Sequence, residues 1–356
     1  MPTRSRARNL GIPFEGESGR LNAITDVAGV RVGHTTLIRD GKPDYSDAVR
    51  TGVTAIIPKL NSDREAVFAG WFRLNGNGEL TGTAWIDEAG ILDGPILTTN
   101  TLSVGVVHSA ITEYARAQGL PPERWSLPVV GETWDGDLND IRGLHVRKED
   151  AFSAIDRAAT GIVPEGNVGG GTGMVCYEFK GGIGTASRIV QSDGAFTVGV
   201  LVQANHGLRD QLHIAGVPVG RKLKEGARHT VDTGSILGIV ATDAPLLPHQ
   251  LARLARRCSL GLARTGSISG NGSGDLFLAF STANEGAIEA PKVRQLSALP
   301  ENRLDPLFQA VVEATDEAIV NCLIAAETMV GVGRHRVEAL PQEQLATILQ
   351  ESLRLP

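Results

Sequence analysis

The sequence predicts an α/β (α+β) protein in which stacked β-sheets are covered by helices. Strand-like segments fill the first two thirds of the 356-residue chain, and long helical patterns fill the last third. The strands form two hydrophobic sets, as expected for two sheets that share a core. With 42% hydrophobic residues, 4% aromatic residues and 43 glycines, the composition is typical of a tightly packed protein with many turns. No repeat or long linker interrupts the chain, so we expect a single compact domain over residues 1–356.

The predicted strands are short segments of alternating or continuous apolar residues. They cover residues 24–36, 53–58, 65–73, 95–98, 196–204, 235–241 and 276–281. The predicted helices have apolar residues three and four positions apart, and they cover residues 103–117, 149–159, 248–264, 304–330 and 342–353. The pattern is clearest in 248–264, where one face carries Leu251, Leu254, Ala255, Cys258 and Leu262. The polar, basic stretch 221–229 is the best candidate for an exposed loop.

Charge, cysteines and histidines argue against several classes of function. A formal net charge of −6 argues against nucleic acid or an anionic membrane as a partner. The three cysteines are widely spaced and form neither a disulfide framework nor a zinc motif, and none of the eight histidines has metal-ligand spacing. No apolar run is long enough to cross a bilayer, and no secretory segment follows Met1. We therefore expect a cytoplasmic protein that uses no metal and no cofactor.

The most glycine-dense segment, residues 166–173, invites comparison with a phosphate-binding loop. A dinucleotide fingerprint needs a strand before the glycines and a helix after them. Here the residues that follow, 174–184, have the pattern of a strand and a hairpin. We therefore interpret the segment as tight backbone packed against a site, and keep a nicotinamide-dependent oxidoreductase only as a remote alternative.

A Gly-Ser dipeptide, Gly234-Ser235, stands where a predicted buried strand begins. Because glycine has no Cβ, the carbonyl before the serine is accessible to the serine hydroxyl. If that bond is cut, Ser235 gains an α-amine with a pKa of about 7.7–8.0, which can accept the hydroxyl proton. The ordinary alternative is a Gly-Ser pair that opens a strand after a turn. Of the other Gly-Ser bonds, at Ser267 and Ser273, the second is followed by a further glycine, which would hold a new amine poorly.

Three further segments carry polar side chains suited to hydrolysis. Asn205 closes a predicted strand and could donate to an oxyanion, although asparagine there is also a common turn former. Ser273 and Asp275 lie in a glycine-rich loop, which is either a simple turn or a pair that orients an amine and shuttles a proton. Glu132 and Trp134 fit a surface turn, and together they would also make a pocket for a substrate ammonium.

These segments together resemble the DmpA-like aminopeptidases, the family that includes the β-peptidyl aminopeptidases. The resemblance covers nearly the whole chain, in one order. It is carried by residues 22–27, 29–34, 50–55, 78–82, 99–105, 179–185, 241–246 and 271–275. Several distinct motifs in a single order are far more specific than any one of them.

The resemblance implies a four-layer αββα sandwich that looks like the N-terminal-nucleophile hydrolases but has different connectivity. It also implies a precursor that cuts itself between Gly234 and Ser235. The products would be an α subunit, residues 1–234, and a β subunit, residues 235–356, with several αβ units assembled as a homo-oligomer.

The family's functional residues are matched one by one. Ser235 matches the nucleophile, Asn205 the oxyanion donor, Ser273 and Asp275 the Ser-x-acid pair beside the nucleophile, and Glu132 the acid that holds the substrate amine. Two positions depart from the pattern. Asp275 stands where β-peptide-cleaving relatives have glutamate, so its reach is one methylene shorter, and Trp134 stands where some members have tyrosine. Both departures bear on substrate preference more than on the type of reaction.

We therefore predict a self-processed serine aminopeptidase that acts on short peptides, amides or esters through an acyl-enzyme on Ser235. One alternative is acyl transfer to an amine, as in ornithine acetyltransferase-like proteins of related architecture. A second is a non-catalytic binding protein on the same fold. An intact chain that forms no acyl-enzyme with an activated ester would favour the second alternative.

Overall fold

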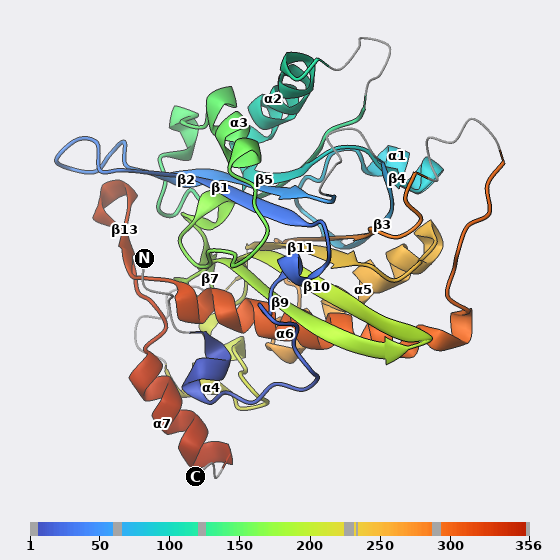
Figure 1. The fold of residues 1–356 in the computed structure, drawn as a ribbon. Coiled ribbons are helices and arrows are strands. Elements are labelled where there is room, and N and C mark those ends of the chain that lie inside the picture. Colours follow the sequence, from blue (N-terminus) through green and yellow to red (C-terminus); the bar gives the residue numbers. More distant parts are fainter. Residues whose placement is uncertain are drawn as a thin grey trace.

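Two β-sheets stack face to face, and helices cover both outer faces (Figure 1). The computed structural model describes residues 6–59, 66–119, 126–223, 231–232, 234–286 and 293–353. One sheet has four strands and the other has six. The layers therefore follow the order helices, smaller sheet, larger sheet, helices.

The smaller sheet has the strand order β1-β2-β5-β6. Its strands are β1 (Arg31–Arg39), β2 (Val49–Ile57), β5 (Ile96–Asn100) and β6 (Val129–Thr133). The pairs β1–β2 and β2–β5 are antiparallel, and β5–β6 is parallel. Helices α2 (Val104–Ala117) and α3 (Lys148–Asp156) cover its outer face (Figure 1).

The larger sheet has the strand order β4-β3-β12-β11-β10-β9. Its strands are β4 (Ile91–Leu92), β3 (Val67–Gly76), β12 (Gly274–Ser281), β11 (Ser235–Thr242), β10 (Gly194–Asn205) and β9 (Gly182–Ser192). The central strands β11 and β12 are parallel and buried throughout, and helix α5 (Pro248–Arg264) connects them. Helices α5 and α6 (Asp305–Ala325) cover the outer face. A parallel pair needs such a crossover, which explains why a helix follows β11 directly.

Each boundary between layers is filled by its own apolar core. Between the two sheets, Ile56 and Ile96 of the smaller sheet pack with Leu237 and Leu278 of the larger one. A second core lies between the larger sheet and helices α5 and α6, and a third between the smaller sheet and helices α2 and α3. Because each sheet has an apolar core on both of its faces, its buried strands carry apolar residues on both faces.

Shorter elements complete the chain. They are helices α1 (Thr83–Ala89), α4 (Val219–Lys222) and α7 (Gln342–Leu353), the hairpin β7 (Val175–Cys176) and β8 (Phe179–Lys180), and the pair β13 (Met329–Val330) and β14 (Arg336–Val337). Over the described part of the chain, none of the helices combines the length and apolarity that a bilayer crossing needs.

Most predicted elements are confirmed, and the exceptions have local causes. The predicted strand 24–36 begins only at Arg31, because the Asp26 carboxylate binds the N–H groups of Leu21 and Ala23 and forms a turn. The predicted helix 304–330 ends at Ala325, since Ala326 is extended. Residue 65 of the third predicted strand and residues 224–229 of the predicted loop lie outside the described residues.

The glycine-rich segment 166–173 packs tightly against strands of both sheets. A Cβ at Gly170 would lie 2.1 Å from Gln203 Oε1, and one at Gly171 would lie 2.5 Å from the backbone nitrogen of Ile183. The residues that follow form the predicted hairpin, β7–β8. The segment is thus close-packed backbone, as the sequence indicates, and no helix begins directly after it.

Candidate active site

Ser235 lies at the edge of the larger sheet where three strands meet. It is the first residue of β11, and it pairs with Asn205 at the end of β10 and with Gly274 at the start of β12. Its side chain is buried, and its Oγ accepts a hydrogen bond of 3.2 Å from the Gly274 N–H. The strand ladder therefore brings the predicted nucleophile and the predicted oxyanion donor to the same position of one sheet edge.

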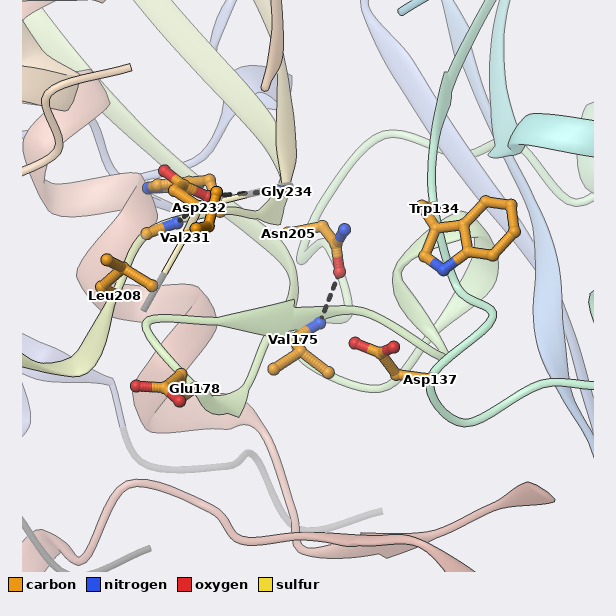
Figure 2. A pocket seen from close by; sticks show the side chains of 11 residues that line it. Trp134, Asp137, Val175, Glu178, Asn205, Leu208, Val231, Asp232 and Gly234 are labelled. Atoms are coloured by element: carbon orange, nitrogen blue, oxygen red, sulfur yellow. Dashed lines mark hydrogen bonds between the residues drawn. The ribbon is translucent and has the colours of Figure 1, made fainter. Parts of the chain in front are cut away.

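The Asn205 side chain is held by the β7 strand. Its Oδ1 accepts a hydrogen bond of 2.7 Å from the Val175 N–H, and Figure 2 shows its nitrogen at the other end of the amide. Because the amide oxygen is already bound, Nδ2 is left to donate. Val175 is a residue that sequence analysis missed, since a backbone N–H leaves no signal in the side-chain pattern.

Ser273 and Asp275 form a buried pair next to Ser235. Ser273 Oγ donates to Asp275 Oδ1 at 2.6 Å, and Ser269 Oγ donates to Asp275 Oδ2. Burial raises the pKa of Asp275, the two serine hydrogen bonds lower it, and the nearby charge of Asp232 raises it further. The predicted pair is thus brought together, and Ser269 is a partner that the sequence did not reveal.

Glu132 does not lie in a surface turn, so this one of the two alternatives left open by the sequence is wrong. It belongs to β6, whose residues are all buried, and it is only 4% exposed. Its Oε1 accepts a hydrogen bond of 2.9 Å from the Glu79 N–H, and its Oε2 accepts one from the Thr101 hydroxyl. Burial raises the pKa of Glu132. Thr101 and Glu79 both lie in segments that carry the family resemblance, although the sequence pattern indicates no role for either residue.

Glu132 and Ser235 approach each other through Gly78. A Cβ at Gly78 would lie 3.3 Å from Glu132 Oε1 and 3.3 Å from the Cα of Gly274, the residue that pairs with Ser235. Both distances are shorter than most Cβ contacts, so Gly78 lies in close contact with both groups. The buried carboxylate therefore lies close to the ladder partner of Ser235, the predicted nucleophile, although it comes from the other sheet.

A pocket of about 100 Å³ opens beside Gly234 and Asn205. Trp134 lines its far side, and Figure 2 shows the indole and the Asn205 amide on opposite sides of an open space. Trp134 is 42% exposed, so its ring is available to a ligand. The carboxylates of Asp137 and Asp232 also line the pocket, which gives it an acidic character.

Within the described segments, no group of three or more histidine, cysteine or acidic side chains is arranged to hold a metal ion. The chemistry that this geometry offers is that of a hydroxyl, an amide donor and two buried carboxylates. The Ser235 hydroxyl lies next to the Gly234–Ser235 bond, and cleavage of that bond would free the α-amine of the same residue. A hydroxyl and an amine on one residue are suited to acyl transfer.

Comparisons with known proteins agree with this geometry. The sequence model of peptidase family S58 matches residues 22–337. The chain is 49% identical to the beta-peptidyl aminopeptidase BapA of Sphingosinicella microcystinivorans, over 98% of this chain and 93% of the relative.

Solved structures give the same result. The L-aminopeptidase D-Ala-esterase/amidase of Ochrobactrum anthropi superposes with a TM-score of 0.93 at 47% identity, covering 99% of both chains. That enzyme is described as a prototype of the serine aminopeptidases and a variant of the Ntn hydrolase fold. A β-aminopeptidase of Burkholderia sp. superposes with a TM-score of 0.91 at 48% identity, over 99% of this chain and 100% of the other. The predicted fold class and the resemblance are therefore confirmed.

Proposed function

The chain belongs to peptidase family S58 and is an aminopeptidase, and on that premise we propose that it is self-processed and acts through Ser235. The observation that carries the proposal is the register of the sheet edge, in which Ser235 pairs with Asn205 on one side and with Gly274 on the other. We propose short peptides, amides or esters with a free amino terminus as substrates. The names of the relatives, a β-peptidyl aminopeptidase and an aminopeptidase with esterase and amidase activity, support this class.

Processing precedes turnover. Ser235 Oγ attacks the Gly234 carbonyl, and the two fragments are an α subunit, residues 1–234, and a β subunit, residues 235–356. The new α-amine and the hydroxyl belong to the same residue, and we expect both to be held in place because Ser235 begins a fully buried strand. Both fragments contribute to the larger sheet, so we expect them to stay together as one domain.

In turnover, the neutral amine of Ser235 accepts the hydroxyl proton as Oγ attacks the scissile carbonyl of the substrate. Asn205 Nδ2 donates to the developing oxyanion. The Ser273–Asp275 pair lies beside Gly274, which binds Ser235 Oγ, and there it orients the amine and passes the proton to the leaving group. Water then releases the acyl group, and the amine and hydroxyl of one residue replace the separate histidine of a triad.

The substrate's own ammonium group binds at Glu132, whose buried carboxylate is separated by Gly78 from Gly274, the residue that pairs with Ser235. The Trp134 ring borders the pocket and offers an aromatic face to the same cation or to the substrate side chain. A binding group for the amine makes the enzyme act at amino termini.

Intact-mass spectrometry with N-terminal sequencing tests the proposal. The smaller fragment should begin Ser-Ile-Leu-Gly-Ile-Val, and the Ser235→Ala variant should remain a full-length, inactive chain. A fragment that begins Ser-Gly-Asp-Leu-Phe would move the nucleophile to Ser273. Product analysis with an added amine acceptor separates hydrolysis from acyl transfer, because an acyltransferase would pass the acyl group to the amine.

We further propose a cytoplasmic enzyme built from several αβ units. The thiols of Cys176, Cys258 and Cys322 are free and buried, which suits a reducing compartment. Light scattering on the eluted protein would give the mass of the assembly, and a mass of one chain would contradict the homo-oligomer.

A further inference from the structure

Asp232 is a buried carboxylate that lies two residues before Gly234, the residue on the amino-terminal side of the proposed cleavage bond. It has no part in the turnover chemistry described above. Its Oδ1 accepts a hydrogen bond of 3.1 Å from the Gly234 N–H, which Figure 2 shows, and one of 3.1 Å from the Gly207 N–H. Gly207 follows Asn205 by two residues. One carboxylate oxygen therefore ties the residue before the scissile bond to the segment that carries the oxyanion donor.

Gly234 is held from a second direction by close packing. A Cβ at this position would lie 2.1 Å from the Asn205 carbonyl oxygen and 2.6 Å from the His206 Cα. The backbone before the scissile bond thus lies directly on the Asn205–His206 backbone. Together, the hydrogen bond and the packing leave the Gly234 peptide little freedom to move relative to Asn205 and Ser235.

Stability alone does not explain this carboxylate. Asp232 is 7% exposed, and its Oδ2 is buried without a hydrogen-bond partner among the described residues. A buried carboxylate oxygen that lacks a partner destabilises the folded state. An arrangement that costs stability and contacts the residue to be cut is typical of a functional site.

We propose that Asp232 is a positioning residue for the cleavage of the Gly234–Ser235 bond. This inference rests on the proposed self-processing. Asp232 fixes the Gly234 N–H, and so presents the Gly234 carbonyl carbon to Ser235 Oγ with the Asn205 amide alongside.

The bonds that form and break are those of an acyl shift followed by hydrolysis. Ser235 Oγ bonds to the Gly234 carbonyl carbon, the bond from that carbon to the Ser235 nitrogen breaks, and the hydroxyl proton ends on the nitrogen. Water then cleaves the ester, which leaves the Gly234 carboxylate and restores the Ser235 hydroxyl beside its free amine. Asp232 exchanges no proton in either step and acts through the geometry of Gly234.

The test follows the conversion of the full-length chain into fragments 1–234 and 235–356 during cell-free synthesis, by intact mass over time. Asp232→Ala removes the acceptor, and it should slow conversion by roughly 10- to 100-fold, as expected for a lost hydrogen bond to a charged group. Asp232→Asn keeps an acceptor oxygen without the charge, and it should convert within about threefold of the parent. The matched control is Asp137→Ala, which removes an exposed carboxylate from the same pocket and should convert at the parent rate.

The outcomes separate this inference from the proposed function. Conversion of Ser235→Ala would defeat the self-processing mechanism itself. If Ser235→Ala stays intact, the inference is overturned by an Asp232→Ala chain that melts cooperatively and converts at the parent rate, or by an Asp232→Asn chain as slow as Asp232→Ala. Should Asp232→Ala fail to fold, Asp232→Leu fills the same volume without an acceptor, and the same slow conversion is expected.

Discussion

The two sides of the candidate site are built in different ways. On the nucleophile side, Asn205, Ser235 and Gly274 come from neighbouring strands of one sheet, and their positions follow from the ladder. On the amine side, Glu132 comes from the other sheet and is held by the Thr101 hydroxyl and the Glu79 N–H. Asn205 and Glu132 both stand in strands, and hydrogen bonds orient both side chains. The proposed roles differ, because the first side acts on the reacting carbonyl and the second binds the substrate amine. Changes on the first side should therefore affect kcat, and changes on the second should affect KM.

The largest effect is expected at Asn205. Asn205→Ala should lower kcat by roughly 10²–10³-fold, because one oxyanion donor is lost, with much less change in KM. Steady-state kinetics on an amide substrate measures both constants. An unchanged kcat would mean that Asn205 is only the end of a strand and that the ladder does not assemble the site.

A near-isosteric variant serves as the control for this experiment. Asn205→Asp keeps the oxygen that accepts the Val175 N–H but replaces the donor by a second acceptor. Its kcat should fall at least as far as that of Asn205→Ala, since a carboxylate repels an oxyanion. A kcat close to that of the parent would show that the bond to Val175, and not the free nitrogen, is the important feature.

A smaller effect, and in KM, is expected on the amine side. Glu132→Gln removes the charge while keeping the shape, so KM for substrates with a free amino terminus should rise by roughly 10–100-fold. The same substrate with an acetylated amine gives the comparison, because it lacks the ammonium group that we propose Glu132 to bind. If the parent cleaves blocked and free substrates equally well, Glu132 does not bind an amine, and the contrast between the two sides fails.

The smallest effect is a dependence of KM on pH. Burial raises the pKa of Glu132, so in the parent the carboxylate gains its proton at a higher pH than an ordinary glutamate, whose pKa is about 4.3. Only the ionised form attracts an ammonium, and KM should therefore rise as the pH falls through this raised pKa. Glu132→Gln should lose this acidic limb, and a limb of the same shape in both proteins would assign it to another group.

Asn205 and Glu132 also show how far sequence patterns reach. Asn205 ends an apolar run and Ser235 begins one. Apolar periodicity therefore predicts that both residues lie at strand ends on the same side of a sheet. Glu132 stands in a short strand that contains a glycine and is followed by tryptophan, aspartate and glycine, which together have the pattern of a turn. Its strand character comes from pairing with β5, a contact that the local sequence does not encode.

The partners that hold these side chains could not be predicted at all. Val175 and Glu79 act through backbone N–H groups, which every residue except proline has. Ser269 reaches Asp275 from a left-handed conformation, with φ of 52°, that serine seldom adopts. Such contacts depend on where the chain turns in space and leave no trace in residue type.

The sequence by itself determined the layered α/β fold, the family, and the residue types of the candidate nucleophile, donor and acids. It did so because apolar periodicity specifies strands and helices, and because several ordered motifs identify a family. Only the tertiary structure decided that Glu132 is buried, that Gly78 lies between it and Gly274, and that Asp232 binds the Gly234 N–H. These are contacts between segments far apart in the chain or between backbone atoms, and their geometry exists only once both sheets have packed.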